Sequence, residues 1–581
     1  MVFKKMKRTD VGGLRRRALD CLICGLLAAT PSAFAQQALP DPSVELRRQQ
    51  DNEAARRALL MPTDRLAPKD LRAEEGERLP EGESPCFDIQ ALRLVGPDAA
   101  GFNWALGELA GPRGDDPPQG RCLGVQGINL VQKRLQNAII ARGYVTTRVI
   151  VENQNIASGV LSFHPIGGRL AQVVVPASAR EHIHAATALP ASPGDLINLR
   201  DVEQALENLQ RVPTVNADLQ IAPGQAAGLS DLQLNWTQDR RWRLGVSLDD
   251  AGSDSTGKFQ GTTTASADNL LGLSDLAYVS FTRGFGGGDG PSPKGSQALA
   301  AHYSVPWGYW LYSLNLSRNE YHQTVVGAFD NYRYSGESDH IELNVDRVLW
   351  RNNRHVTTAH ASLQRRTSNN FIDDTEVLVQ RRAVASLVWG LSHRMYWGPS
   401  ILAGEFSFKQ GLNGLGTLPA PEEAFDEGTS RYRLTTASLN AQVPWKARGD
   451  AWRYSATVRL QKHHTRLTPQ DRFSIGGRYT VRGFDNAASL VAESGVLWRN
   501  ELNWSPGWAH GQSPYLGWDM GRVSGPSTAN LSGTTLIGAV LGVRGLLVGC
   551  QYDVFWGKPI SKPAELKAAS STWGFMLHRG F

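Results

Sequence analysis

The chain lacks any long hydrophobic run. Its 581 residues are 41% apolar, yet no stretch of about 18 or more consecutive apolar residues occurs, which argues against a membrane-spanning helix. The apolar content is nevertheless too high for a disordered chain, and the length exceeds that of one ordinary domain. The sequence therefore predicts several folded units without a helical membrane anchor.

The chain also has little net charge once its first 35 residues are set aside. The formal charge is +6, of which seven basic and two acidic residues in segment 1–35 contribute +5, so the remainder carries about +1. A chain balanced in this way lacks the basic surface that binds polyanions. We expect no nucleic-acid partner.

Sequence motifs of enzymes and metal sites are missing as well. Neither H-E-x-x-H nor G-x-S-x-G occurs, and the glycine-rich segment 284–290, expected in an outer loop, lacks the order of a phosphate loop. His463 and His464 are adjacent in a predicted strand, so they point to opposite faces and cannot chelate one metal ion. We expect no catalytic residue, cofactor or metal. The alternative, an outer-membrane protease or phospholipase, needs an acid–base cluster that the sequence does not present.

Segment 1–35 has the organisation of a signal peptide. Three arginines, Arg15–Arg17, precede an apolar stretch over 18–29, and Ala33-Phe34-Ala35 provides a small-x-small cleavage site before Gln36. A twin-arginine signal is the alternative. We expect the segment to be removed on export.

Cysteines are few, and their positions separate them into two groups. Cys21 and Cys24 form a C-x-x-C motif, but within the segment that is cut off, so we expect no redox or metal role. Cys86 and Cys122 fall in one predicted small domain of an exported protein, which favours a disulfide, with two buried thiols as the alternative. Closing that loop would add about 3–4 kcal/mol. Cys550 is predicted to be unpaired.

Tryptophan and tyrosine are nearly absent before residue 241. Of 30 such residues, 27 lie in 241–581, so residues 36–240 form a different kind of protein. Their first part predicts a helix over 41–60 with a weak apolar stripe at Val44, Ala55 and Leu59, followed by a flexible linker rich in Pro, Glu and Arg.

After the linker, a helix followed by a hairpin occurs twice, about 70 residues apart. Apolar residues recur at helical spacing in both copies: Ile128, Val131, Leu135 and Ile139, then Leu199, Val202, Leu206 and Leu209. The predicted strands are 144–151 and 159–165 in the first copy, and 215–221 and 229–236 in the second. This repeat predicts two tandem α+β modules. The alternative is that the spacing arises by chance.

Residues 241–581 alternate between apolar and polar residues. Trp242, Leu244, Val246 and Leu248 illustrate the period of two, which is typical of strands with one apolar face. Sixteen strands are predicted to start near 241, 257, 274, 296, 309, 333, 355, 381, 399, 432, 452, 495, 513, 534, 546 and 571.

The connections between these strands alternate in length. Those after even-numbered strands are mostly short, as in 306–308, and those after odd-numbered strands are mostly long, as in 467–494. An outer-membrane barrel sorts its loops this way, whereas a soluble all-β protein has no reason to. We predict an all-β transmembrane barrel of 16 antiparallel strands, with Trp573, Phe575 and Phe581 as its membrane-insertion signal.

Two motifs carry a family resemblance. Val481-Arg482-Gly483-Phe484 resembles the lumen-loop motif of the outer-membrane assembly and secretion transporters, and Gly517-Trp518-Asp519-Met520-Gly521 resembles the second, strand-borne motif of that superfamily. Segments 122–129, 142–148, 268–275 and 303–306 resemble its two-partner secretion branch. Any one motif is weak, but their order along the chain is specific.

The resemblance implies a domain order and a site. An N-terminal plug helix would occupy 36–60, a linker 61–83, two POTRA modules 84–166 and 167–240, and the barrel 241–581. The long loop would fold into the lumen, with Arg482 bound to Asp519 between Gly517 and Gly521 on the barrel wall. A bidentate arginine–carboxylate contact fixes geometry well. In a wet lumen we expect it to contribute about 1 kcal/mol. The alternative is an exposed arginine and an unrelated aspartate.

The resemblance also implies a function: a TpsB-type transporter of the Gram-negative outer membrane with its POTRA modules in the periplasm. It would secrete one large adhesin, haemolysin or contact-dependent toxin, whose N-terminal secretion domain binds the POTRA modules by strand addition. Other expected partners are outer-membrane lipid and, during biogenesis, the barrel assembly machinery. The rivals are an assembly factor for other barrels and a passive porin.

Overall fold

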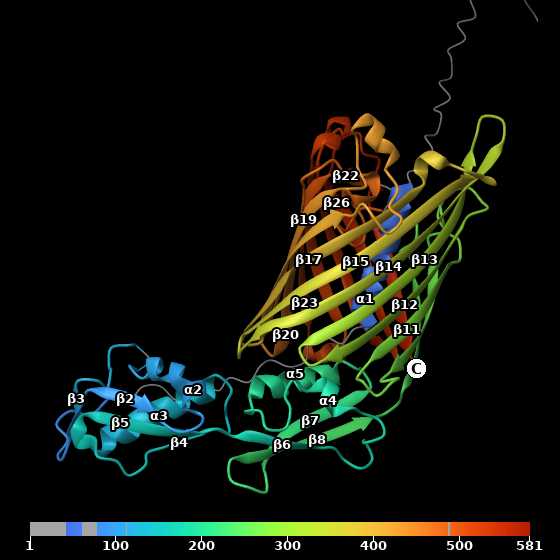
Figure 1. Cartoon of the computed structure of the whole chain (residues 1–581). Helices are drawn as coiled ribbons and strands as arrows, with labels where there is room; N and C mark the ends of the chain where they lie inside the picture. Colours follow the sequence, from blue (N-terminus) through green and yellow to red (C-terminus); the bar gives the residue numbers. More distant parts are fainter. Residues whose placement is uncertain (1–41, 61–77, 112, 486–488) are drawn as a thin grey trace, which may run out of the picture.

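The computed structural model describes residues 42–60, 78–111, 113–485 and 489–581. The predicted signal peptide, with Cys21, Cys24 and the cleavage site before Gln36, lies outside these residues, as does most of the predicted linker. The described chain forms a helix, two small α+β modules and a barrel (Figure 1).

Sixteen long antiparallel strands close into the barrel, as predicted, because β9 pairs with both β10 and β27. Closure leaves no strand edge unpaired in lipid. The strands are β9 (Trp242–Asp249), β10 (Gln260–Asp268), β11 (Leu276–Gly284), β12 (Gly295–Trp307), β13 (Trp310–Val326), β14 (Asn331–Arg351), β15 (His355–Ile372), β17 (Arg382–Trp397), β18 (Ser400–Gly411), β19 (Arg433–Ala447), β20 (Asp450–His463), β23 (Ser494–Ser505), β24 (Ser513–Ser524), β25 (Thr535–Leu547), β26 (Cys550–Ser561) and β27 (Thr572–Gly580).

One strand start was misplaced by the sequence pattern. The strand predicted near 546 begins at Cys550, because residues 546 and 547 still belong to β25. Val548 and Gly549 then make the turn with φ angles of 50° and 76°. The two-residue strand β16 (Thr375–Glu376) extends the sheet beyond β15. Short 3-10 helices lie in the loops: η3 (Leu378–Gln380), η4 (Pro421–Phe425), η6 (Gly507–Ala509) and η7 (Pro526–Asn530).

The first module packs one helix on small sheets. Its elements are β1 (Phe87–Ile89), β2 (Ala91–Leu94), α2 (Ala99–Phe102), η1 (Asn103–Glu108), β3 (Arg121–Leu123), α3 (Val125–Ala141), β4 (Arg148–Ile150), η2 (Ile156–Ser158) and β5 (Val160–Ile166). Strand β5 lies between β2 and β4. The strand predicted over 144–151 is limited to β4. Gly143 turns the chain with a φ of 101°, and the Thr147 N–H donates to the Tyr144 carbonyl, so residues 144–147 form a turn.

The second module repeats the plan. It contains β6 (Arg169–Val174), α4 (Ala185–Ala188), α5 (Leu199–Gln210), β7 (Val215–Pro223) and β8 (Leu229–Gln238), with β8 between β6 and β7. Strand β6 was not predicted, whereas α5 and the β7–β8 hairpin were. In Figure 1 this module lies directly beneath the barrel and the first module lies to its side.

Residues 78–83, predicted as the end of the linker, belong to the first module. Leu79 is buried in the same cluster as Phe102 and Leu135. The Glu83 carboxylate accepts hydrogen bonds from three backbone N–H groups at the start of α3, at 2.8–3.0 Å. Charge of this sign stabilises a helix N-terminus. The predicted disulfide between Cys86 and Cys122 is confirmed, and Cys550 is a free cysteine.

Helix α1 (Pro42–Leu60) lies inside the barrel (Figure 1). Its side chains make polar contacts with the loop between β9 and β10, where Arg48 donates to Thr256 and Asn52 to the Ala251 carbonyl. Arg57 contacts Glu342 on the wall strand β14. A helix without an apolar face needs such partners, since it has no core to pack on. Within the residues that the structure describes, no helix is both long and apolar enough to cross a membrane.

Candidate functional site

The candidate site is the segment between β20 and β23, which folds back into the lumen. It contains η5 (Pro469–Asp471) and a small hairpin, β21 (Phe473–Ile475) paired with β22 (Leu490–Ala492). The sequence predicted only an irregular loop here. Apolar side chains of the segment pack on those of the wall and form one buried cluster: Phe473, Ile475, Val481, Phe484, Leu490, Ala492, Leu497, Val523 and Leu536.

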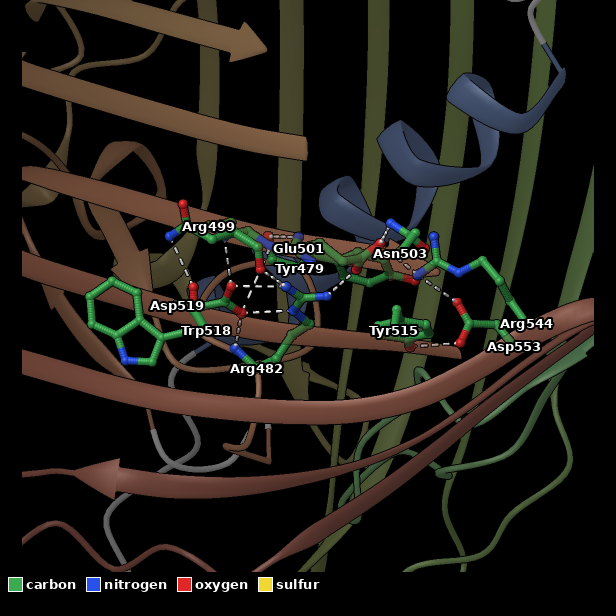
Figure 2. Close-up of polar contacts among 11 residues, drawn as sticks. Tyr479, Arg482, Arg499, Glu501, Asn503, Tyr515, Trp518, Asp519, Arg544 and Asp553 are labelled. Atoms are coloured by element: carbon green, nitrogen blue, oxygen red, sulfur yellow. Dashed lines mark hydrogen bonds and ion pairs between the residues drawn. The ribbon is translucent and has the colours of Figure 1, made fainter. Parts of the chain in front are cut away.

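Arg482 and Asp519 meet in this segment, as the motifs implied. The guanidinium donates from Nε to one carboxylate oxygen at 2.7 Å and from Nη2 to the other at 2.9 Å, and the Arg482 backbone N–H donates to the same carboxylate at 3.0 Å. Figure 2 shows the pair with its neighbours. The contact is therefore bidentate and joins the tip of the loop to β24.

The pair is not in a wet environment, contrary to the sequence-based expectation. Arg482 is 5% exposed and Asp519 is 0% exposed. The apolar neighbours of Arg482 in the chain, Val481 and Phe484, are buried as well. Removing one partner of a buried pair leaves an uncompensated charge, which costs about 3–5 kcal/mol. The expectation of about 1 kcal/mol was made for a wet pair and for the net contribution of the contact, which is a different quantity from this cost of removing one partner.

Further charged side chains extend the site, and the sequence analysis missed them. Arg482 also binds Glu501 of β23, and Glu501 in turn binds Arg544 of β25 at 3.0 Å. Arg544 lies 3.4 Å from Asp553 of β26. These charges alternate in sign along the neighbouring strands β23, β24, β25 and β26, and Figure 2 shows their side chains. The resemblance placed Asp519 on the lumen face. Glu501 lies two residues after Arg499, which pairs with Asp519, so the period of two places Glu501 on the same face.

The glycines of the two motifs make room for the loop. A Cβ on Gly517 would lie 2.5 Å from the Arg482 guanidinium, and one on Gly521 would lie 2.9 Å from Val481. Gly483 adopts a φ of 96° and approaches the Lys558 backbone, where a Cβ would lie 2.6 Å from the carbonyl oxygen. Side chains at these three positions would separate the loop from the wall.

A second anchor holds the base of the loop. Asp471 of η5 binds Arg366 of β15 at 3.0 Å and lies 3.7 Å from Lys409 of β18. It was not recognised in the sequence, because nothing in its local pattern marks it as buried. The loop is thus tied to both sides of the lumen.

The remaining predicted residues lie elsewhere on the barrel. His463 contacts Ser494 and His464 contacts Thr435, so the two rings do not meet. Trp573 and Phe581 are exposed on β27 and at the end of the chain. The Phe581 backbone exchanges two hydrogen bonds with Leu244 of β9 and so takes part in closure. In the ranges that the structure describes, no three His, Cys, Asp or Glu side chains are arranged to hold a metal ion.

The second module is fastened to the periplasmic turns of the barrel. Asn208 of α5 donates to the Gly308 carbonyl at 2.7 Å, and the buried side chain of Arg351, the last residue of β14, binds Gln204 and Glu207. Arg211, directly after α5, donates to the Ser304 hydroxyl at 2.7 Å. Burial lowers the pKa of Arg211 to about 10, so it stays protonated at neutral pH.

Comparison with known proteins agrees with this architecture. The family of the haemolysin secretion/activation proteins ShlB/FhaC/HecB matches residues 228–545, a ShlB-type POTRA domain matches 115–164, and a further POTRA domain matches 169–223. The chain belongs to the ShlB/FhaC/HecB family. Members of this family are transporters of two-partner secretion, and the chain is one that resides in the outer membrane with its POTRA modules in the periplasm.

Relatives within the family match along nearly the whole chain. The outer membrane transporter CdiB-2 of Burkholderia pseudomallei is 34% identical over 95% of this chain and 96% of its own length. The haemolysin transporter HpmB of Proteus mirabilis is 23% identical over 70% of this chain and 72% of its own. The structure of CdiB from Acinetobacter baumannii superposes with a TM-score of 0.81 at 25% identity, covering 94% of this chain and all of that one. A factor that assembles other barrels is therefore not favoured.

Proposed function

We propose that this transporter captures one large unfolded exoprotein on its POTRA modules and passes it through the lumen after α1 has left. The observation that carries the proposal is the position of α1 in the lumen, held there by polar contacts such as Asn52 to Ala251 and Arg57 to Glu342. Polar contacts exchange readily for contacts with water, so a helix held in this way can leave at low cost.

Capture is assigned to the free edge of the first module. Strand β4 pairs with β5 alone among the described strands. On its other edge the Val149 backbone is bound only by side-chain amides, since its N–H donates to Gln136 and its carbonyl accepts from Gln132, and an incoming strand would replace them. Ile150, Val151 and Ile166 are exposed beside this edge. An unfolded chain can add a strand there, with backbone hydrogen bonds for affinity and an apolar row for its side chains.

Deletion of the gene tests export. We expect one large protein, an adhesin, haemolysin or contact-dependent toxin, to disappear from the cell surface and supernatant while other outer-membrane barrels assemble normally. Failure of those barrels would indicate an assembly factor, and an unchanged set of secreted proteins with altered uptake of small solutes would indicate a passive porin.

Cross-linking tests the departure of α1. Asn52 and Gln260 approach each other to 3.5 Å through their side chains. We replace both with cysteine in a Cys550→Ser background and join them with a short cleavable bismaleimide. Export should stop in the joined protein and return after cleavage of the linker, whereas each single cysteine variant, treated identically, should export normally. Continued export by the joined protein would contradict the proposal.

A further inference from the structure

The outer wall of the barrel changes from apolar to charged on neighbouring strands. Glu342 of β14 binds Arg57 of the lumen helix, so Ile341 faces outward because successive side chains of a strand alternate. The same face carries exposed apolar residues on the adjoining strands, namely Phe281, Leu299 and Leu316. This apolar band is the surface that contacts lipid chains.

Toward the end of the barrel with the long loops, the outward positions become polar. Arg283 follows Phe281 by two residues, and Gln297 precedes Leu299 by two. Strands β13, β14 and β15 have 17, 21 and 18 residues, whereas about 9–11 suffice to cross the hydrocarbon core. They therefore project beyond the hydrocarbon, and their charged rows stand at the level of the outer-leaflet headgroups.

A hollow of about 560 Å³ lies in this region, between strands β11 and β15. The charged and titratable side chains that line it are Arg283, Lys294, Glu320, His322, Arg333 and Glu337. The His322 ring lies against Gly295, where an added Cβ would be 2.6 Å away. The missing side chain at Gly295 thus leaves space for the ring at the edge of the hollow.

The two carboxylates of the hollow already have partners. Glu320 accepts from Arg318 at 2.9 Å and from Gln297 at 2.6 Å. Glu337 accepts from the same guanidinium at 3.0 Å. Arg318 offsets one of their two negative charges, so the three lining cations, Arg283, Lys294 and Arg333, outnumber the one that remains.

The cations differ in what they bind. The Lys294 ammonium donates to the carbonyls of Asp254, Gly288 and Gly290, and so joins two outer loops. By contrast, within the described parts of the chain no hydrogen bond or ion pair engages the guanidinium of Arg283 or Arg333, and both residues are exposed. Two unpaired arginines thus face one hollow at the boundary between lipid chains and headgroups.

We propose that this hollow binds the phosphate of an outer-leaflet glycolipid, with Arg283 and Arg333 as the phosphate ligands. A guanidinium presents a fork of donors that matches a phosphate group, and basic pockets at the headgroup level select anionic lipids. The acyl chains of the same lipid would lie along the apolar band formed by Phe281, Leu299 and neighbouring residues. The lipid would then fix the depth at which the long strands β13, β14 and β15 lie in the membrane.

Native mass spectrometry of the full-length protein in detergent tests the site, with bisphosphorylated lipid A as the probe. The double variant Arg283→Glu, Arg333→Glu should bind the probe at least tenfold more weakly, and Arg283→Gln, Arg333→Gln should show a smaller loss in the same direction. Lipid A without its phosphates should bind the unmodified protein as weakly as the double glutamate variant binds the probe.

The matched control is Lys462→Glu, Arg522→Glu. These exposed residues lie on β20 and β24, across the barrel from the hollow, and the control should bind within twofold of the unmodified protein. Heat-modifiable gel mobility verifies that each barrel is folded. Equal loss in the control, equal binding of dephosphorylated lipid, or displacement of the probe by millimolar inorganic phosphate would each overturn the assignment to a lipid.

Discussion

The two carboxylates around Arg482 contribute unequally. Asp519 is fully buried and accepts the backbone N–H and two guanidinium N–H groups of Arg482. Glu501 accepts from one guanidinium nitrogen and is shared with Arg544. Asp519 therefore determines where the loop tip lies, while Glu501 adds charge compensation.

We expect Asp519→Asn to reduce export severely and Glu501→Gln to reduce it mildly. An amide at 519 leaves the buried guanidinium with less compensation, a loss of about 3 kcal/mol or more. With glutamine at 501, Arg482 still has Asp519 and Arg544 still has Asp553. Secreted exoprotein is quantified by immunoblot at equal levels of folded barrel. Equal effects of the two substitutions would contradict this ranking.

We also expect Gly521→Ala to displace the loop. The new Cβ would lie 2.8 Å from Ile475 and 2.9 Å from Val481, and overpacking of this kind costs about 1–3 kcal/mol. Limited proteolysis should cut the loop faster and export should fall. Gly404→Ala in β18 is the control, since its nearest neighbour would be 3.7 Å away, and proteolysis and export should be unchanged there.

Among the elements, the chain over 78–83 is stabilised by contacts far away in sequence. The Leu79 N–H donates to Asp116 at 2.9 Å, and the Arg134 guanidinium binds the same carboxylate. Burial alone would raise the pKa of Asp116, but the hydrogen bonds from Leu79 and Arg134, together with the charge of Arg134, outweigh it and hold the pKa below its usual range.

This depressed pKa predicts an acid-sensitive contact. A carboxyl with a lower pKa in the folded state contributes stability that is present above about pH 4 and is lost as the pH falls through the folded pKa. The protection factor of the Leu79 amide, which is the intrinsic exchange rate at each pH divided by the measured rate, should therefore fall below about pH 4 in the full-length protein. Asp116→Asn should exchange faster at neutral pH and lose most of that acid dependence; an acid dependence that persists in this variant would contradict the assignment.

For the molecule as a whole, the prediction concerns the pore. Helix α1 fills part of the lumen, and the loop carrying Arg482 is anchored on both sides of it. Removal of residues 42–57 should raise the single-channel conductance in planar bilayers several-fold, because water and ions replace the helix. Arg351→Ala, which weakens the fastening of the second module outside the lumen, serves as the control and should leave conductance unchanged; an unchanged conductance in the truncated protein would contradict the plugging role.

The sequence pattern was sufficient for the architecture of the barrel. Because side chains of a strand alternate between lipid and lumen, the period of two identified all sixteen strands, and loop lengths separated the two ends of the barrel. The disulfide was predicted because both cysteines fall in one small domain of an exported protein. The Arg482–Asp519 pair was predicted from the resemblance of two motifs to those of a transporter superfamily. Burial of that pair did not follow, since it depends on the loop docking on the wall, where its apolar side chains form one cluster with Leu497, Val523 and Leu536.

Long-range packing accounts for what the pattern missed. Residues 78–83 have the composition of a linker, and their positions are fixed by contacts with Asp116 and the start of α3 and by burial of Leu79. Glu501, Arg544 and Asp471 look like ordinary charged residues until closure of the barrel brings their partners within reach. Periodicity is local and can be read along the chain, whereas burial and charge pairing depend on which strands become neighbours, and those neighbours exist only in the closed structure.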